Sequence, residues 1–315
     1  MRSLRGPAAE EYRAGLAAAA RAGRDALARG ESALAAVVAA ARHMEASGAF
    51  NAGRGSCLDE DGQATLDAAL MRGVDRAAGA VGALSATLHP TDVCLDLLQE
   101  GRHVLLVGEG ADRRARRLQL PPLPPPTPEL LATWRRMRAE GQAKARPEDL
   151  GSVGRPDDEG RLRAGQEDRG GDTVGAVAVD AQGRVAAAVT TGGLWLKARG
   201  RVGDSGLPGA GLFACDELGA ASSTTGIGER MMRALTGKQA CDLVGAGASP
   251  AEAARRAVED VARRFGPASC GLIVVDRQGR IGAAFDTLGM GRALARVGQD
   301  EVPVAVWPQD PFPGE

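Results

Sequence analysis

The chain has 315 residues, of which 44% are apolar and only 3% aromatic, and its 39 Lys and Arg side chains nearly balance 40 Asp and Glu. A formal net charge of -1 gives no electrostatic reason to expect binding to nucleic acid or to an anionic membrane. Five scattered cysteines, with no Cys-x-x-Cys pair, favour a reducing compartment and free thiols. We find no secretory leader pattern and no apolar run of the ~20 residues that span a bilayer, so we expect a soluble, cytoplasmic protein.

The N-terminal part of the chain predicts helices separated by short strands. Ala-rich residues 8–29 favour a helix that Gly30 ends, and Ser32 can cap a second helix from 33 to about 45. Asn51 follows in a glycine-rich loop, whose backbone or amide is expected to approach another group closely. The later pattern predicts strands over 80–85 and 103–110, the second one buried, and a helix over 90–100.

The composition changes at Arg113. An Arg cluster leads into a Pro-rich run from Pro121 to Pro128, and a charged, Gly-rich stretch follows a helical piece around 130–142. We expect residues from about 113 to 171 to form an exposed, flexible linker.

A hairpin follows this linker directly. Two apolar runs, 174–180 and 184–189, flank a Gly-containing turn, which is the pattern of an antiparallel strand pair. Thr173 opens the first strand, while Thr190 and Thr191 close the second. Because these ends are neighbours in an antiparallel pair, we expect the three hydroxyls to gather there.

The C-terminal part predicts further strands and helices. A strand is expected over 209–215, and residues 220–225 lead into a Gly-rich turn and a helix over about 229–236. Ser249 begins a helix to about 265 with a capping box, and an edge strand is expected within 302–307. A second hairpin over 271–289 repeats the first at a constant offset of 96 residues. Two copies indicate a shared packing demand, not a solenoid.

The hydroxyl cluster carries the chemical argument. A threonine hydroxyl is a weak nucleophile without an adjacent base, and the three histidines are scattered without partners at useful spacing. A cut before Thr173 would free an α-amine with a pKa of ~8, which can act as base for its own side chain. The Asp172–Thr173 bond is therefore the predicted cleavage site, broken by attack of the Thr173 hydroxyl on the Asp172 carbonyl.

The order of the motifs resembles that of the N-terminal-nucleophile (Ntn) asparaginases, which comprise plant-type asparaginase/isoaspartyl peptidases, glycosylasparaginases and threonine aspartases. The resemblance spans nearly the whole chain. Its motifs are Phe50-Asn51-Ala52-Gly53-x-Gly55-Ser56, Asp172-Thr173-Val174-Gly175-Ala176-Val177-Ala178, Thr191-Gly192-Gly193, Gly200-Arg201-Val202-Gly203-Asp204-Ser205, Gly209-Ala210-Gly211 and Thr225-Gly226-x-Gly228-Glu229. Each motif alone is a weak signal, and their common order makes the resemblance specific.

The resemblance implies an α+β fold of one domain over residues 1–315, the αββα four-layer sandwich of Ntn hydrolases. Self-cleavage would yield an α subunit, 1–172, and a β subunit, 173–315. The family also suggests a homodimer of such αβ units.

The resemblance further implies catalytic roles. Thr173 would be the nucleophile, with Thr191 supporting its hydroxyl and amine. Thr225 and Gly226 would form the oxyanion hole, with Asn51 nearby.

Other matching residues would bind a small-molecule substrate with an aspartyl head. Arg201 would hold its α-carboxylate and Asp204 its α-ammonium, while Gly228 would line the pocket. The physics agrees, because a guanidinium fork pairs with a carboxylate and a carboxylate with an ammonium.

The sequence departs from the family pattern in places. The family begins with a strand that ends in a His-Gly-Gly-Ala-Gly type turn, and Met1 falls just where that turn would end, so we expect either that the start codon is misplaced or that this central strand is missing. Asp172 precedes the nucleophile, as in glycosylasparaginases and threonine aspartases, where plant-type enzymes usually have Gly. No cofactor is expected, apart from the sodium ion that some relatives hold through backbone carbonyls of the loop matching Met44 to Arg54.

Our leading hypothesis is an autoprocessed amidohydrolase, an asparaginase/isoaspartyl peptidase that acts on the side-chain amide of L-asparagine and on β-aspartyl peptides. Glycosylasparagine is an alternative substrate, because it shares the amino-acid head. A threonine-aspartase-like protease would have no use for an ammonium pocket, so Asp204 speaks against it. An unprocessed, inactive homologue that acts as a binding scaffold is the alternative from a different class.

Overall fold

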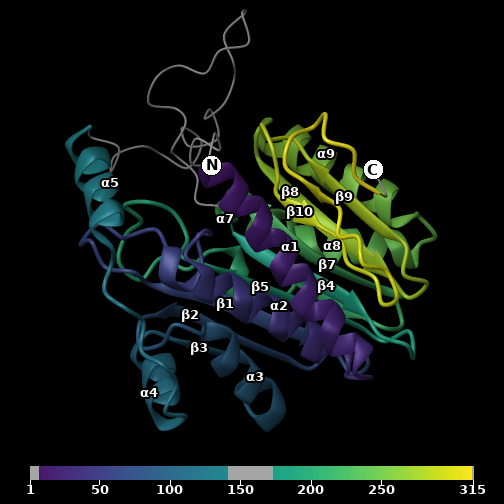
Figure 1. Ribbon diagram of the computed structural model, residues 1–315, viewed down its shortest axis with the longest axis horizontal. Coiled ribbons are helices and arrows are strands. Elements are labelled where there is room, and N and C mark those ends of the chain that lie inside the picture. Colours follow the sequence, from purple (N-terminus) through teal and green to yellow (C-terminus); the bar gives the residue numbers. More distant parts are fainter. Residues whose placement is uncertain (1–6, 141–172, 314–315) are drawn as a thin grey trace, which may run out of the picture.

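The computed structural model describes residues 7–140 and 173–313. Within them the chain has a mixed α+β fold, in which two β-sheets face each other and helices cover their outer faces (Figure 1). The five-stranded sheet has the order β3 (Leu105–Val107), β2 (Ala78–Leu84), β1 (Leu66–Arg72), β5 (Val185–Thr191), β4 (Val174–Val179). The four-stranded sheet has the order β6 (Leu212–Cys215), β7 (Ala220–Gly226), β8 (Cys270–Asp276), β9 (Ile281–Phe285), and β10 (Arg292–Ala293) pairs separately with β11 (Val304–Ala305).

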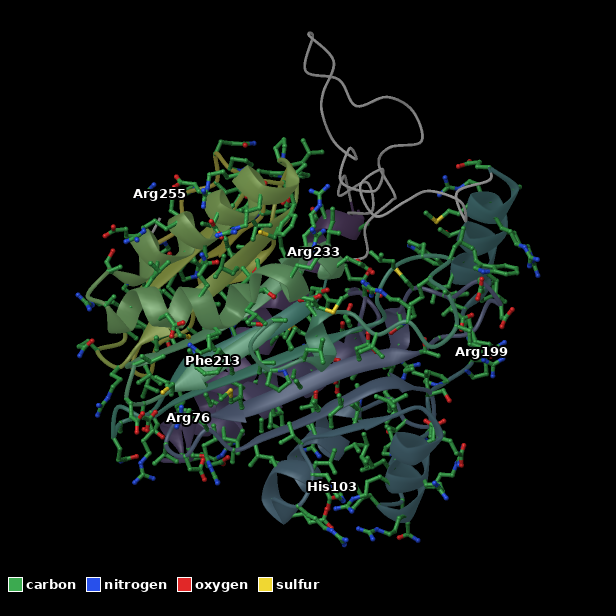
Figure 2. All side chains as sticks on the ribbon, turned by 180° about the vertical axis from the view of Figure 1, so that it is seen from behind. Arg76, His103, Arg199, Phe213, Arg233 and Arg255 are labelled. Carbon is green, nitrogen blue, oxygen red and sulfur yellow. The ribbon has the colours of Figure 1, made fainter. Side chains whose placement is uncertain are left out.

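The helices form two covers. The helices are α1 (Pro7–Ala28), α2 (Ala33–Ser47), α3 (Pro90–Glu100), α4 (Glu109–Arg117), α5 (Pro128–Ala139), α7 (Gly228–Ala234), α8 (Thr236–Gly245) and α9 (Pro250–Phe265). Helices α2, α3 and α4 pack on the five-stranded sheet, and α8 and α9 pack on the four-stranded sheet. In the opposite view of Figure 2, His103 marks the end of the molecule with α3 and α4, and Arg233 and Arg255 mark the cover of the other sheet.

The alternation of side chains along each strand explains this layering. In β1, Ala68 and Leu70 pack under the helices, while Ala69 and Met71 face the four-stranded sheet. The same alternation holds in β4 and β5, because successive strand residues point to opposite faces. Small side chains dominate both strands of the hairpin, which lets the second sheet approach closely.

Several predicted elements are confirmed with their caps. The Ser32 hydroxyl accepts the Ala35 N–H at the start of α2, and the Ser249 hydroxyl accepts the Glu252 N–H at the start of α9. Both hairpins are antiparallel as expected, and the tail contributes the short strand β11.

Other predictions about the elements were wrong or incomplete. The strand after residue 103 is not buried, because β3 lies at the edge of its sheet and Val104 and Val107 are each 52% exposed. Strand β1 was not predicted, although it is the centre of the five-stranded sheet. Its sequence, Leu-Asp-Ala-Ala-Leu-Met-Arg, contains no β-branched residue and shows no strand preference by itself. Helix α8 was also missed.

The described part of the predicted linker, residues 113–140, is largely helical and partly packed on the rest of the chain. Helices α4 and α5 lie within the range 109–139, and Leu130 and Met137 of α5 are buried. The Trp134 indole N–H donates to the Asp59 carbonyl at 2.8 Å, which ties α5 to the turn before β1. The rest of the expected linker, 141–172, lies outside the described residues.

A cavity of about 570 Å³ runs along β4. In the described ranges β5 is the only strand that pairs with β4, so the other edge of β4 faces this cavity. Helices α1 and α2, strands β8 and β9 and the stretch 291–297 supply most of the other walls, which are mostly apolar. The predicted site residues do not line this cavity, so it is separate from the candidate active site.

Candidate active site

The hydroxyls of Thr173 and Thr191 meet where the β4–β5 hairpin opens. Thr173 Oγ1 donates to Thr191 Oγ1 at 3.1 Å. The register pairs Val174 with Thr190, so antiparallel geometry sets the two threonines side by side. The expected gathering of hydroxyls is thus confirmed for this pair but wrong for Thr190, which is fully buried and points to the opposite, helix-covered face of β5, because successive strand residues alternate in direction.

Asn51 holds this arrangement from the other side. Its amide nitrogen donates to Gly193 O at 2.7 Å and to Thr191 Oγ1 at 3.4 Å, and its amide oxygen accepts the Cys57 N–H at 2.8 Å. Its backbone carbonyl accepts the Gly192 N–H. All of these groups are buried, so the Asn51 amide fixes the turn after β5 to the loop after α2.

Thr191 Oγ1 is the centre of the hydroxyl cluster. It accepts the Gly193 N–H at 3.0 Å, in addition to the donors from Asn51 and Thr173. The two shorter contacts, from the Gly193 N–H and the Thr173 hydroxyl, use the two lone pairs of this oxygen, so the Gly193 N–H orients the oxygen that holds the Thr173 hydroxyl.

Arg201 and Glu229 form a largely buried ion pair near this cluster. Arg201 Nε and Nη2 donate to the two carboxylate oxygens of Glu229 at 2.9 and 3.0 Å. This pairing raises the pKa of Arg201 against the opposing effect of burial, and Arg201 lowers the pKa of Glu229 although burial raises it. Nη1 remains on the side of Gly193, whose added Cβ would lie 3.2 Å from it.

Asp204 is a buried carboxylate beside Arg201. It is 4% exposed, and its Oδ2 accepts the Thr224 hydroxyl at 3.0 Å. Burial raises the pKa of Asp204 to about 7, against the lowering effects of Thr224 and Arg201. A partner cation would restore the charged form, so this carboxylate suits an incoming ammonium group.

Gly228 leaves room between these two charged side chains. A Cβ at this position would lie 2.8 Å from Arg201 Nη2 and 2.9 Å from Asp204 Oδ1. Gly228 starts α7, so the space between the two head-binding candidates is bounded by a helix N-terminus.

Thr225 and Gly226 end β7. Gly226 has a φ of +139°, and an added Cβ would lie 2.3 Å from the Ser269 carbonyl oxygen, so only glycine fits. Ser223, two residues earlier, packs against Gly175 of β4, which brings the two sheets together at this end. Within the described residues, no hydrogen bond joins Thr173 to Thr225 or Gly226, and Asp172 lies outside these residues.

The sequence reasoning missed several residues of this region. Glu229 was quoted only as part of a motif, and Thr224, Asp67 and Lys197 were not singled out. Lys197 and Asp67 are nearly or fully buried charges, and a lone Lys or Asp has no periodic signal that distinguishes it from a surface residue. Only Glu229, which follows a Gly-x-Gly turn at a predicted helix start, had a local signal.

The described residues contain no group of three or more His, Cys, Asp or Glu side chains arranged to hold a metal ion. In the same ranges, none of the helices combines the length and apolarity that crossing a bilayer requires.

Comparisons with known proteins give consistent results. A family model described as asparaginase matches residues 2–304. The plant-type L-asparaginase of Pyrobaculum calidifontis is 39% identical over 263 residues, which cover 84% of this chain and 83% of the relative. The isoaspartyl peptidase of Escherichia coli is 38% identical, covering 91% of this chain and 86% of the relative. The isoaspartyl peptidase/L-asparaginase of Danio rerio is 34% identical, covering 92% and 88%.

Proposed function

The chain belongs to the asparaginase family, and on that premise we propose that it hydrolyses the side-chain amide of L-asparagine and of β-aspartyl peptides. The observation that carries the proposal is the 3.1 Å contact between the hydroxyls of Thr173 and Thr191, close to the partly buried Arg201 and the buried Asp204. The names of the relatives support the same substrate class. The facing sheets with outer helices support the finer assignment as a four-layer Ntn-hydrolase sandwich.

The proposed reaction begins with self-cleavage at Asp172–Thr173: the Thr173 hydroxyl attacks the Asp172 carbonyl, the peptide C–N bond breaks as an ester forms on Oγ1, and water hydrolyses this ester to leave Asp172 with a carboxylate and Thr173 with a free amine and hydroxyl. The freed α-amine of Thr173 then accepts the proton of its own Oγ1, which attacks the substrate amide carbon. Backbone and side-chain donors at Thr225 and Gly226 stabilise the negative oxygen. The ammonium of Thr173 returns the proton to the leaving amine, and water then releases the aspartyl product from Oγ1.

The substrate head would be held by opposite charges. Glu229 occupies one edge of the Arg201 guanidinium, which leaves the end with Nη1 for the α-carboxylate. Asp204 would receive the α-ammonium, and Gly228 leaves the space between them open. Binding of these two groups directs the side-chain amide toward Thr173, and it does not depend on the leaving group.

We further propose that the segment from Met44 to Arg54 folds without sodium. Its first residues, 44–47, form the last turn of α2, where Arg54 Nε donates to the Ala46 carbonyl at 3.1 Å and the Ser47 hydroxyl donates to the Met44 carbonyl. A guanidinium on the Ala46 carbonyl disfavours a second cation there. The melting temperature should be equal in sodium chloride and in choline chloride of the same ionic strength, and stabilisation by sodium alone would refute this.

The test of the function uses denaturing gels, intact mass and ammonia release. We expect wild-type protein to yield two fragments, the smaller one beginning at Thr173, and to release ammonia from L-asparagine and leucine from β-aspartyl-leucine. Thr173→Ala should stay at full length and be inactive. If the wild type stays uncut and resembles Thr173→Ala in every assay, the enzyme hypothesis fails and the scaffold alternative stands.

A further inference from the structure

Two buried side chains of opposite charge type, Asp67 and Lys197, lie under the loop that carries Arg201 and Asp204. Asp67, the second residue of β1, is fully buried, and Lys197, in the stretch between β5 and that loop, is 5% exposed. Asp67 lies opposite Thr191 in the register of β1 and β5, so it adjoins the hydroxyl cluster as well. Figure 2 shows Arg199, which precedes this loop, on the side of the molecule that carries α5.

The Asp67 carboxylate joins two backbone segments. Oδ1 accepts the Ala83 N–H and Oδ2 accepts the Gly203 N–H, each at 2.9 Å. Ala83 has a φ of +49°, and the pairing of β1 with β2 shifts register at this point. The carboxylate therefore stabilises an irregular stretch of β2 and, through Gly203, the backbone between Arg201 and Asp204.

Lys197 supplies the nearby positive charge. Its ammonium donates to the Thr65 carbonyl at 2.8 Å, two residues before Asp67. Burial lowers the pKa of Lys197, and the charge of Asp67 opposes this effect. A Cβ on Gly193 would lie 3.0 Å from Lys197 Nζ and 3.2 Å from Arg201 Nη1, so the two cations face the turn after β5 together.

We propose, on the basis of the function proposed above, that Asp67 is a positioning residue for the substrate head. Its two backbone hydrogen bonds set the loop so that Arg201 and Asp204 converge, and Lys197 balances its buried charge. Asp67 touches neither the substrate nor the reacting atoms. Its effect should therefore appear in substrate affinity and in the ionisation of Asp204, and much less in the chemical step.

The charge of Asp67 also acts on Asp204. The titratable groups that face Asp204 are Arg201, which lowers its pKa, Asp67, which raises it, and the Cys270 thiol on β8. Removal of the Asp67 charge should therefore lower the pKa of Asp204. A merely structural residue would not cause this shift.

The experiment compares Asp67→Asn with wild type and with Asp180→Asn. Asparagine has the same shape as aspartate, but its amide NH₂ cannot accept a hydrogen bond, so one of the two backbone N–H donors would lose its acceptor. Asp180 is a matched control, because it is buried and accepts three backbone N–H groups at the opposite end of the β4–β5 hairpin from Thr173. Measurements are kcat and KM for L-asparagine across pH, and calorimetric binding of L-aspartate, which carries the same head.

We expect Asp67→Asn to raise KM and the Kd of L-aspartate about tenfold, while kcat changes less than about threefold. The acidic limb of the pH profile of kcat/KM should shift to lower pH by about half a unit. Asp180→Asn should leave these quantities at their wild-type values. Unchanged KM and acidic limb in folded Asp67→Asn, or equal changes in Asp180→Asn, would overturn the proposal.

If Asp67→Asn does not fold, Asp67→Glu keeps the charge but displaces the carboxylate, so KM should rise while the acidic limb stays in place; an unchanged KM would overturn the proposal. If wild type hydrolyses neither substrate, the proposed function fails, and L-aspartate binding alone decides the role of Asp67. Absence of L-aspartate binding as well would overturn both.

Discussion

Asp204 is a buried carboxylate whose charge lowers the stability of the fold but can serve to bind a substrate. Its carboxylate is buried with a hydroxyl donor and a guanidinium nearby, and burial still raises its pKa to about 7. The charged form is thus poorly supported until a cation arrives. A substrate ammonium would supply that cation, which links binding to ionisation.

This raised pKa predicts a pH dependence of substrate affinity. Below about pH 7 Asp204 becomes protonated and can no longer pair with an ammonium group, so KM for L-asparagine should rise as the pH falls. Steady-state kinetics between about pH 5 and pH 9 check this. A KM that stays flat while kcat alone titrates would show that Asp204 is not the ammonium partner.

The same shift predicts a stability effect of Asp204→Asn. A carboxyl with a raised folded-state pKa stabilises the fold fully below its unfolded pKa of ~4, and this contribution is lost as the pH rises through about 7. Asparagine never ionises, so the variant should melt higher at about pH 8, by about 2 °C or more, with a smaller difference near pH 5. Both proteins should also carry Thr173→Ala, so that neither is cleaved and the two melting temperatures compare the same form of the chain. An equal difference at both pH values would contradict the predicted sign.

At the scale of elements, helix α7 and the turn before it shape the proposed binding site for the α-carboxylate and α-ammonium of the substrate. Gly228 begins α7 directly beside Arg201 and Asp204, and Gly226 leaves β7 in a conformation that favours glycine. The position at which this short helix starts therefore matters for binding. A side chain at its first residue would fill the space for the substrate head.

We expect Gly228→Ala to raise KM at least about tenfold and to lower the melting temperature. The added methyl meets the ends of the Arg201 and Asp204 side chains and lies 3.1 Å from the Asp204 backbone nitrogen, so it fills the space for the substrate head and also strains the fold. Gly110→Ala in α4 is the control, because a Cβ there has open space and alanine favours helix. Equal KM values for the two variants would remove Gly228 from the pocket.

At the scale of the whole molecule, the described segments on either side of residues 141–172 share their sheet and core. β1 and β5 form six register pairs across this division. The core between the sheets combines Ala69 and Met71 from the first segment with Val189 and Leu212 from the second. Cleavage before Thr173 would therefore leave both fragments within one hydrophobic core.

The cleaved fragments should accordingly stay together. In size-exclusion chromatography with light scattering, we expect both to elute in one peak, at the mass that the family-implied dimer of αβ units predicts, and to separate only in denaturant. Separation of the fragments in plain buffer would contradict the shared core as the source of cohesion. A stable single αβ unit would contradict the dimer alone.

The sequence by itself determined the local features. The Ser32 and Ser249 caps, the two hairpins and the pairing of Thr173 with Thr191 follow from short-range patterns, since turn chemistry and strand register act over a few residues. The ordered motifs added the family, and with it the roles expected for Arg201 and Asp204.

Only the tertiary structure decided the burial and partners of the charged groups. It showed that β1 is central although its residues favour no strand, and that Glu229 occupies one edge of Arg201. It also placed Asp67 and Lys197 beneath the loop that carries Arg201 and Asp204. Burial, partner charges and close approach arise from segments far apart in the chain, so no local pattern could have specified them.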